Sequence, residues 1–310
     1  MGYFTTADEW KDVQPIPQDE GGPSPLAAIA YPEDYAEAMS YLRAVMADNE
    51  MSERALQLTE TIIGANPAHY TVWLYRARII LAMNYDLRKE IEWLNPTALR
   101  NLKNYQIWHH RQTMIENLGS ADGEQAFVAS MLEKDTKNYH VWSYRQWLVR
   151  RFDLWDQGEL EAVESLIKDD VRNNSAWNHR WFVVFGGDEG NFKNEEILER
   201  EIAYAQDAIR LAPQNQSPWN YLRGLIRHAK LPASKFQNFA EEFATLEKPD
   251  DISSSHALDL LADIYAEEQD RKSDAAKALD LLAMRFDPIR QNYWNYRKSL
   301  LGPEEVEAAA

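Results

Sequence analysis

Apolar side chains recur along most of the chain with the spacing of amphipathic α-helices, three or four residues apart. The first apolar stripe begins after Pro32 and contains Tyr35, Met39, Leu42 and Met46. A second stripe spans residues 55–63 and stops at Gly64, just before the turn-forming pair Asn66–Pro67. Strict alternation of apolar and polar residues, which marks a β-strand, is nearly absent. The pattern therefore predicts an all-α protein.

A short sequence word is repeated along this helical pattern. It consists of Asn, a Trp four residues later, and an Arg three or four residues after the Trp. The copies that carry all three residues begin at Asn104, Asn138, Asn173 and Asn215. Two weaker copies have His69 and Arg290 in the place of Asn. The tryptophans of the six copies are Trp73, Trp108, Trp142, Trp177, Trp219 and Trp294.

The spacing of these tryptophans indicates the architecture. Successive tryptophans are 35, 34, 35, 42 and 75 residues apart, and a period of about 34 residues fits two antiparallel helices joined by short turns. The step of 42 contains the Gly-rich stretch 186–191, which we interpret as an inserted loop. The step of 75 is expected to contain a repeat without Trp, over residues 255–265. We predict a right-handed α-α superhelix of antiparallel helical hairpins, similar to tetratricopeptide arrays, with about 14 helices.

The same pattern predicts the organisation of the chain. Residues 31–300 form one hairpin-repeat domain, because stacked repeats share a continuous core. Residues 1–30 are rich in Pro and Gly, which favours an extended N-terminal arm that lies on a partner instead of packing into the core. Residues 301–310 form a C-terminal tail.

Each residue of the word has a structural role at the start of a helix. Asn is a favoured N-cap, because its side chain accepts hydrogen bonds from free backbone N–H groups. Trp lies on the first turn and is large enough to fill the gap between neighbouring hairpins. Arg lies on the same face and can stack on the indole or pair with a carboxylate of the next repeat. We interpret the six tryptophans and Arg145 as structural residues.

Charge and composition narrow the possible partners. The net charge of −17 argues against binding to nucleic acid or to anionic membrane surfaces, which recruit Lys and Arg. The chain has no cysteine, so it forms no disulfide and no thiolate metal site. No apolar run approaches the roughly 18 residues of a membrane helix, and no secretory signal is present. We expect a cytoplasmic protein that does not insert into membranes.

The candidate chemistry is sparse. No two histidines have the spacing of a helical metal site, so no metal ligands are predicted. His140 and His179 belong to the repeated word and are expected on the helix surface. Lys137 and Tyr139 flank Asn138 at a helix N-terminus, where a lysine can bind an anionic group such as a phosphate. Lys103 and Arg172 occupy the same place in the adjacent copies. The alternative is that all three cations only neutralise nearby acidic residues.

The repeated word, together with three longer passages, resembles the α subunits of protein prenyltransferases. The passages are residues 137–147, 170–177 and 198–201. They are most similar to the branch that farnesyltransferase and type I geranylgeranyltransferase share. The resemblance covers roughly residues 31–300 and implies a crescent of helical hairpins around a β subunit, with which the chain forms an obligate heterodimer. It implies transfer of farnesyl or geranylgeranyl from its diphosphate to the cysteine of a C-terminal Cys-a-a-X motif, in proteins such as small GTPases.

The resemblance also implies the roles of individual residues. Zinc is held by the β subunit, magnesium is left open, and this chain alone binds neither. Lys137 matches the lysine that meets the diphosphate leaving group, and Tyr139 lies beside it. His140 is expected near the carboxylate of the peptide, and Tyr105 on the side where the peptide leaves. Asn173 matches a functionally sensitive residue that acts on substrate binding or through structure.

Two alternatives stay open at this point. The α subunit of the Rab-modifying geranylgeranyltransferase has the same repeats but usually lacks a lysine at the position of Lys137. A non-catalytic helical-repeat scaffold would have no transferase activity with any β subunit.

Overall fold

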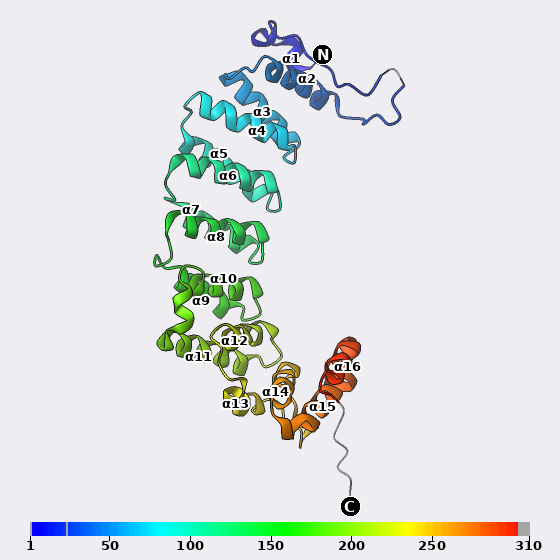
Figure 1. Ribbon diagram of the computed structural model, residues 1–310. Helices are drawn as coiled ribbons and strands as arrows, with labels where there is room; N and C mark the ends of the chain where they lie inside the picture. The colour runs from blue at the N-terminus through cyan, green and yellow to red at the C-terminus, as the bar shows by residue number, and fades with distance from the viewer. Residues whose placement is uncertain (1, 23, 303–310) are drawn as a thin grey trace, which may run out of the picture. The chain divides into compact units, whose positions relative to one another are not determined.

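The computed structural model describes residues 2–22 and 24–302, and every regular element in these ranges is a helix (Figure 1). The described residues fall into two compact units that divide between Asp153 and Leu154. They contain sixteen α-helices, which confirms the all-α fold class. The sequence predicted about 14 helices. The two additional ones, α1 and α13, have only four and five residues.

The first unit is a series of helical hairpins that follows a short N-terminal helix. Its helices are α1 Tyr3–Thr6, η1 Asp8–Trp10, α2 Glu33–Ala47, α3 Glu53–Ala65, α4 Tyr70–Ala82, α5 Leu87–Arg100, α6 Tyr105–Leu118, α7 Glu124–Lys134 and α8 Tyr139–Phe152. The first helix of each hairpin packs on the second, as in α3 on α4, α5 on α6 and α7 on α8. The helices α4, α6 and α8 also pack on one another in that order (Figure 1).

The second unit continues the same arrangement with more short helices. Its helices are α9 Glu159–Asp169, α10 Asn174–Phe185, η2 Glu189–Lys193, α11 Glu195–Leu211, α12 Gln216–His228, η3 Ala233–Phe236, α13 Gln237–Glu241, η4 Pro249–Asp251, α14 Ser255–Glu267, η5 Gln269–Arg271, α15 Lys272–Leu281, η6 Leu282–Phe286, η7 Pro288–Arg290 and α16 Gln291–Ser299. Neighbouring pairs are α9 with α10, α11 with α12, and α14 with α15.

The word marks the start of the second helix of its hairpin, and we call α4, α6, α8, α10, α12 and α16 the word helices. Asn138 caps α8, since its Oδ1 accepts hydrogen bonds from the backbone N–H of His140 (2.9 Å) and Val141 (3.3 Å). The same capping is made by Asn104, Asn173 and Asn215. The Nδ2 of Asn138 also donates to the Leu102 carbonyl of the preceding hairpin, 2.8 Å away. One Asn therefore starts a helix and fixes its position against the previous repeat.

The tryptophans of the word belong to the hydrophobic core of each unit. All six are buried, and in four of them Nε1 donates to a carbonyl six residues earlier. In α8 the donor is Trp142 and the acceptor is the Thr136 carbonyl, at 2.9 Å. In these four copies the ring fills the gap between hairpins and its one polar atom is satisfied by a nearby carbonyl. Trp108 differs, because no hydrogen-bond partner is found for its buried Nε1 among the described residues.

The repeat without Trp lies where the sequence predicted it, as helix α14. Ser254 takes the place of Asn there: its Oγ accepts from the backbone N–H of Ala257 (3.2 Å) and donates to the Pro213 carbonyl (2.6 Å). Leu258 is buried at the position of Trp. This repeat therefore keeps the capping bond and the bond to an earlier carbonyl, although Ser254 and Leu258 replace Asn and Trp.

The N-terminal arm differs from the extended segment that the sequence predicted. Residues 3–10 form α1 and η1, and the rings of Phe4 and Trp10 are buried against Tyr41 of α2, with centroids 5.6 and 5.5 Å from its ring. Arg54 of α3 then binds Asp12 through two hydrogen bonds, of 2.7 and 2.9 Å. The arm therefore covers α2 and the start of α3, because two aromatic side chains gain more from burial than from exposure.

The predicted C-terminal tail, residues 301–310, lies mostly outside the described residues. Only Leu301 and Gly302 belong to the structure as described. Over the described residues, no helix combines the length and the apolar character that a membrane span requires.

Candidate functional site

The candidate site lies at the N-terminal ends of α6 and α8, in the first unit. The hydrogen bond from Asn138 to the Leu102 carbonyl brings these two ends together. Lys103 and Lys137 each precede a capping Asn, and both are exposed. Tyr105 and Tyr139, the first residues of the two helices, have exposed fractions of 69% and 72%. Four of the residues named in the sequence analysis thus share one exposed edge.

His140 joins the two tyrosines. Its ring centroid lies 4.3 Å from that of Tyr105, at an interplanar angle of 81°, and 5.7 Å from that of Tyr139, at 76°. Both are edge-to-face contacts, which aromatic rings favour. The three rings therefore form one continuous strip from α6 to α8, with the half-buried imidazole in the middle.

The environment of His140 favours its neutral form. Burial lowers the pKa of His140, and a hydrogen bond with the backbone of Lys103 acts in the opposite direction but is the smaller effect. A neutral imidazole can orient a tyrosine ring or donate one hydrogen bond, but it adds no positive charge. The positive charge of this edge comes from Lys103 and Lys137.

Lys137 stands where an anion is favoured. It precedes the cap of α8, and the first turn of that helix contains no acidic residue. Its backbone N–H donates to Oδ1 of Asp135, 3.3 Å away, which fixes the turn that leads into the helix. The positive end of the helix dipole and the ammonium group therefore act in the same region.

Asn173 has a different environment from the other predicted substrate-binding residues. It belongs to the second unit, where its side chain is only 1% exposed. Its Oδ1 accepts from the backbone N–H of Ser175 (3.1 Å) and Ala176 (3.3 Å). This side chain caps the N-terminus of α10. A structural role is therefore favoured over a role in substrate binding. Arg145 is also buried, with its guanidinium carbon 5.7 Å from the ring of Trp142.

Sequence reasoning missed a set of buried glutamates that hold the word helices in place. Oε2 of Glu124 in α7 accepts from Nε of Arg111 at 2.7 Å and from the Tyr144 hydroxyl at 2.6 Å. Arg111 belongs to the preceding word helix, α6, and Tyr144 to the next, α8. We call such a trio a glutamate clamp. The described clamps are Arg76–Glu90–His110, Arg111–Glu124–Tyr144 and Arg180–Glu201–Tyr221.

These clamps confirm that the arginine of the word pairs with a carboxylate of the next repeat. They also correct the placement of His179, which is fully buried, with Nε2 2.8 Å from Oε2 of Glu159. His179 occupies the position two residues after Trp, where Tyr144 stands in α8. That position faces the first helix of its own hairpin and not solvent, so either a Tyr or a His there can reach the glutamate.

The fourth full copy of the word has no such clamp arginine. Leu222 occupies the third position after Trp219, and Arg223 follows it. Arg223 pairs with Asp259 (3.1 Å) and Asp263 (2.7 Å) of α14. A shift of one residue along a helix turns the side chain by about 100°, and this change of direction gives it a different acceptor.

The resemblance assigns the zinc ion to the β subunit, and the described residues of this chain offer no site for it. Zinc prefers thiolate, imidazole and carboxylate ligands that converge on one point. The chain has no cysteine, and its described part contains no group of three or more His, Asp or Glu side chains that could hold a metal ion.

Comparison with known families identifies the class of the protein. A sequence model of the protein prenyltransferase alpha subunit repeat matches residues 52–83, 87–118, 121–152, 156–186 and 198–229. Each match begins near the first helix of a hairpin and ends near the end of its word helix. The chain belongs to the protein prenyltransferase α-subunit family.

Individual relatives narrow this result. The chain is 41% identical to the protein farnesyltransferase/geranylgeranyltransferase type-1 subunit alpha of Candida albicans, over 94% of this chain and 97% of that protein. It is 38% identical to the subunit of the same name from Dictyostelium discoideum, over 98% and 96%. Among solved structures, it superimposes on a chain of Candida albicans protein geranylgeranyltransferase-I complexed with GGPP with a TM-score of 0.88, at 38% identity over 96% of this chain and 100% of that one.

Proposed function

We propose that this chain is the α subunit of a heterodimeric prenyltransferase that acts on Cys-a-a-X proteins, such as small GTPases. It would act with a β subunit, in the cytoplasm, on farnesyl or geranylgeranyl diphosphate. The observation that carries the proposal is the position of Lys137 at the exposed N-terminal end of α8, next to an aromatic strip. The matches to shared type-1 subunits along nearly the whole chain support it.

The reaction requires a group that accepts developing negative charge. When the C–O bond of the isoprenoid diphosphate breaks, charge builds up on the leaving diphosphate. The Lys137 ammonium stabilises this charge more in the transition state than in the ground state, which is the condition for catalysis. Tyr139 offers a hydroxyl beside it, which is a neutral hydrogen-bond donor.

The remaining chemistry is assigned to the partner. Zinc held by the β subunit would supply a thiolate from the cysteine of the acceptor protein. Magnesium, if it takes part, would bind the diphosphate. The residues of this chain bind and orient: Tyr105 and His140 provide an aromatic surface for the acceptor peptide, and Lys137 provides the cation.

The Rab-modifying enzyme is the second candidate within the family. The geranylgeranyl transferase type-2 subunit alpha of Mus musculus is 29% identical to this chain over 58% of it, and the match covers 35% of that protein. The lower identity, the shorter match and the lysine at position 137 favour the type-1 assignment. A non-catalytic scaffold would not require any of the passages around Lys137.

The test is co-expression of this chain with farnesyltransferase and type I geranylgeranyltransferase β subunits, followed by transfer assays. We expect a stable heterodimer and transfer of isoprenoid to a Cys-a-a-X peptide. Transfer only to Rab proteins in the presence of an escort would support the second candidate. A chain that forms no complex and gives no transfer with any β subunit would leave only a scaffold.

A further inference from the structure

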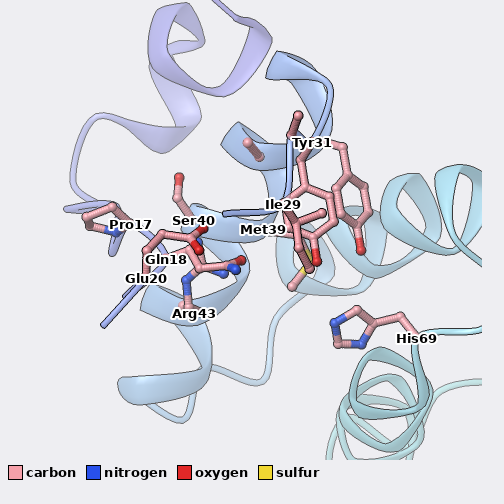
Figure 2. Close-up of a pocket in the computed structure, with 12 residues that line it drawn as sticks. Pro17, Gln18, Glu20, Ile29, Tyr31, Met39, Ser40, Arg43 and His69 are labelled. Carbon is pink, nitrogen blue, oxygen red and sulfur yellow. The ribbon is translucent and has the colours of Figure 1, made fainter. Parts of the chain in front are cut away.

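A cavity of about 450 Å³ lies between residues 17–20 and 29–31 on one side and helix α2 of the first unit on the other (Figure 2). This volume is within the range of about 300–1,000 Å³ that is typical of small-molecule and peptide sites. Its polar lining comes from Glu20, Arg43 and His69, and its apolar lining includes Tyr31, Tyr35 and Met39. None of these residues belongs to the edge formed by α6 and α8.

His69 shows why this cavity differs from an ordinary gap between helices. It occupies the Asn position of the first copy of the word, yet its side chain makes no capping hydrogen bond to α4. Its ring instead lies at the cavity (Figure 2), and its Nδ1 is buried without a hydrogen-bond partner. A buried imidazole nitrogen without a partner is costly, because water is excluded and nothing replaces it. The departure from Asn thus places an imidazole ring at the cavity, where the full copies of the word have a capping amide.

Arg43 is the cation of the cavity. Its Nε donates to the Ile16 carbonyl at 2.8 Å, and its half-buried guanidinium group lines the cavity. Burial lowers the pKa of Arg43, as expected for a cation that has lost water without gaining a counter-charge.

The opposite side of the cavity is aromatic. The rings of Tyr31 and Tyr35 lie with centroids 5.3 Å apart, and the Tyr35 hydroxyl is fixed because it accepts a hydrogen bond from Nδ2 of Asn66 at 3.1 Å. Met39 adds a flexible apolar contact. This wall suits an apolar or aromatic side chain of a ligand.

Glu20 restricts the charge of that ligand. Its carboxylate lines the same cavity as Arg43, so a doubly charged phosphate would meet repulsion as well as attraction. A ligand with one carboxylate and a neighbouring N–H group suits both residues, because arginine binds carboxylates through paired hydrogen bonds and glutamate accepts from N–H.

We propose that this cavity binds a peptide segment in which a carboxylate stands next to an apolar or aromatic side chain. Arg43 takes the carboxylate, Glu20 accepts from a peptide N–H, and the side chain rests on Tyr31, Tyr35 and Met39. The ring of His69 forms part of the wall against which the peptide rests. The carboxylate is either a chain terminus or an acidic side chain. The site does not depend on the transferase role proposed above.

The test uses the full-length chain, labelled with ¹³C in its methionine methyl groups, and follows the NMR signal of Met39. The probes are N-acetyl-phenylalanine, with a terminal carboxylate, its amide, without one, and acetyl-Phe-Glu-amide, with an acidic side chain. We expect a saturable shift with at least one carboxylate probe, at a Kd of about 1 mM for a ligand of this size. Loss of the charged hydrogen bonds should weaken binding of the amide by about tenfold or more.

Two variants test the named residues. Arg43→Gln should abolish the response to the carboxylate probes, and Tyr31→Ser, at a partly exposed position, should weaken it while leaving the fold intact. The matched control is Arg88→Gln, which changes an exposed arginine of α5 and should bind as the wild type does. The relative responses to the two carboxylate probes decide between a terminus and a side chain. No saturable shift with any probe, equal binding of acid and amide, or unchanged binding by both Arg43→Gln and Tyr31→Ser would overturn the proposal.

Discussion

The Tyr144 hydroxyl donates a hydrogen bond to Oε2 of Glu124, 2.6 Å away and twenty residues earlier in the chain. The same carboxylate accepts from Arg111, so one buried charge joins α6, α7 and α8. Burial raises the pKa of Tyr144, which keeps its hydroxyl protonated and able to donate. Because α8 carries Lys137 and Tyr139, this clamp also fixes the helix on which the candidate site depends.

Removal of this carboxylate should be strongly destabilising. Glu124→Ala leaves the buried Arg111 without its counter-charge, and a broken buried ion pair typically costs about 3–5 kcal/mol. Tyr144→Phe removes only one hydrogen bond to a charged group, for about 1.5–3 kcal/mol. The measurement is the free energy of unfolding in urea. The control is Glu133→Ala, an exposed position of the same helix, which should change little. Equal stabilities of Glu124→Ala and Glu133→Ala would contradict the clamp.

Much of the fold could be predicted from the sequence, because one word marks each repeat. Asn and Trp act within one turn of their own helix, and such local contacts depend on spacings that can be read directly. Helix α14 was predicted without its Trp, because the step of 75 residues is about twice the period and residues 255–265 have a helical pattern. Ser254 then caps it as Asn caps the other helices. The clamps were missed because a buried glutamate and a solvent-exposed glutamate cannot be told apart from the residues that surround them in the sequence.

The spacing between a glutamate in the first helix of a hairpin and a Tyr or His in the second would have revealed the clamps. The clamp glutamates of α5, α7 and α11 each lie twenty residues before the Tyr or His of their own word helix. Glu159 of α9 has the same spacing to His179. This distance is constant because a hairpin fixes which turns of its two helices face each other. The residues expected at the candidate site do share one edge; they are Lys137, Tyr139, Tyr105 and His140. The contact of His140 with both tyrosine rings depends on how α6 and α8 pack, so the sequence did not reveal it. The role of Asn173 was harder to predict, because helix capping and substrate binding would use the same side-chain amide atoms.

The clamp of α5 should make stability depend on pH. Burial lowers the pKa of His110, which therefore stays neutral in the folded state. Below about pH 6.5 the unfolded chain takes up a proton on this residue that the folded chain does not, so stability falls with acidity. Burial alone would raise the pKa of Glu90, but bonds from His110 and Arg76 outweigh it and lower the pKa, so the contribution of Glu90 is lost only at a lower pH.

His110→Tyr separates these two effects. Tyrosine occupies the same position in α8 and α12, and it should keep the bond to Glu90 without titrating in this range. Between about pH 6.5 and 4.5 the variant should lose less stability than the wild type, as measured by thermal unfolding at each pH. Identical slopes for the two proteins in that range would show that His110 does not titrate as described.

The docked arm should contribute to the stability of the first unit. Trp10 is 2% exposed, its ring lies 5.3 Å from that of Phe4, and Arg54 lies over it at 5.2 Å. Trp10→Ala should cost about 3–5 kcal/mol, as large-to-small changes of buried aromatic residues do. Hydrogen exchange should increase in α2 and α3. Leu26→Ala, at an exposed position of the same arm, is the control and should leave exchange unchanged. An arm that remains undocked in solution would give no difference between the two variants.

The lysine of the candidate site should be needed for the chemical step and not for assembly. Lys137→Ala removes an exposed side chain, so the fold and the heterodimer should persist, while loss of one preorganised contact to a developing charge should slow single-turnover transfer by about 10²–10³. Size-exclusion chromatography checks assembly, and rapid-quench kinetics with a Cys-a-a-X peptide measures the rate. Lys103→Ala, in the same position of the preceding repeat, is the matched control: it removes an equal charge from the same edge and should have a much smaller effect. A wild-type single-turnover rate in Lys137→Ala would remove this residue from the mechanism. An equal loss in both variants would mean that the edge acts through its total charge, because the two lysines would then be interchangeable.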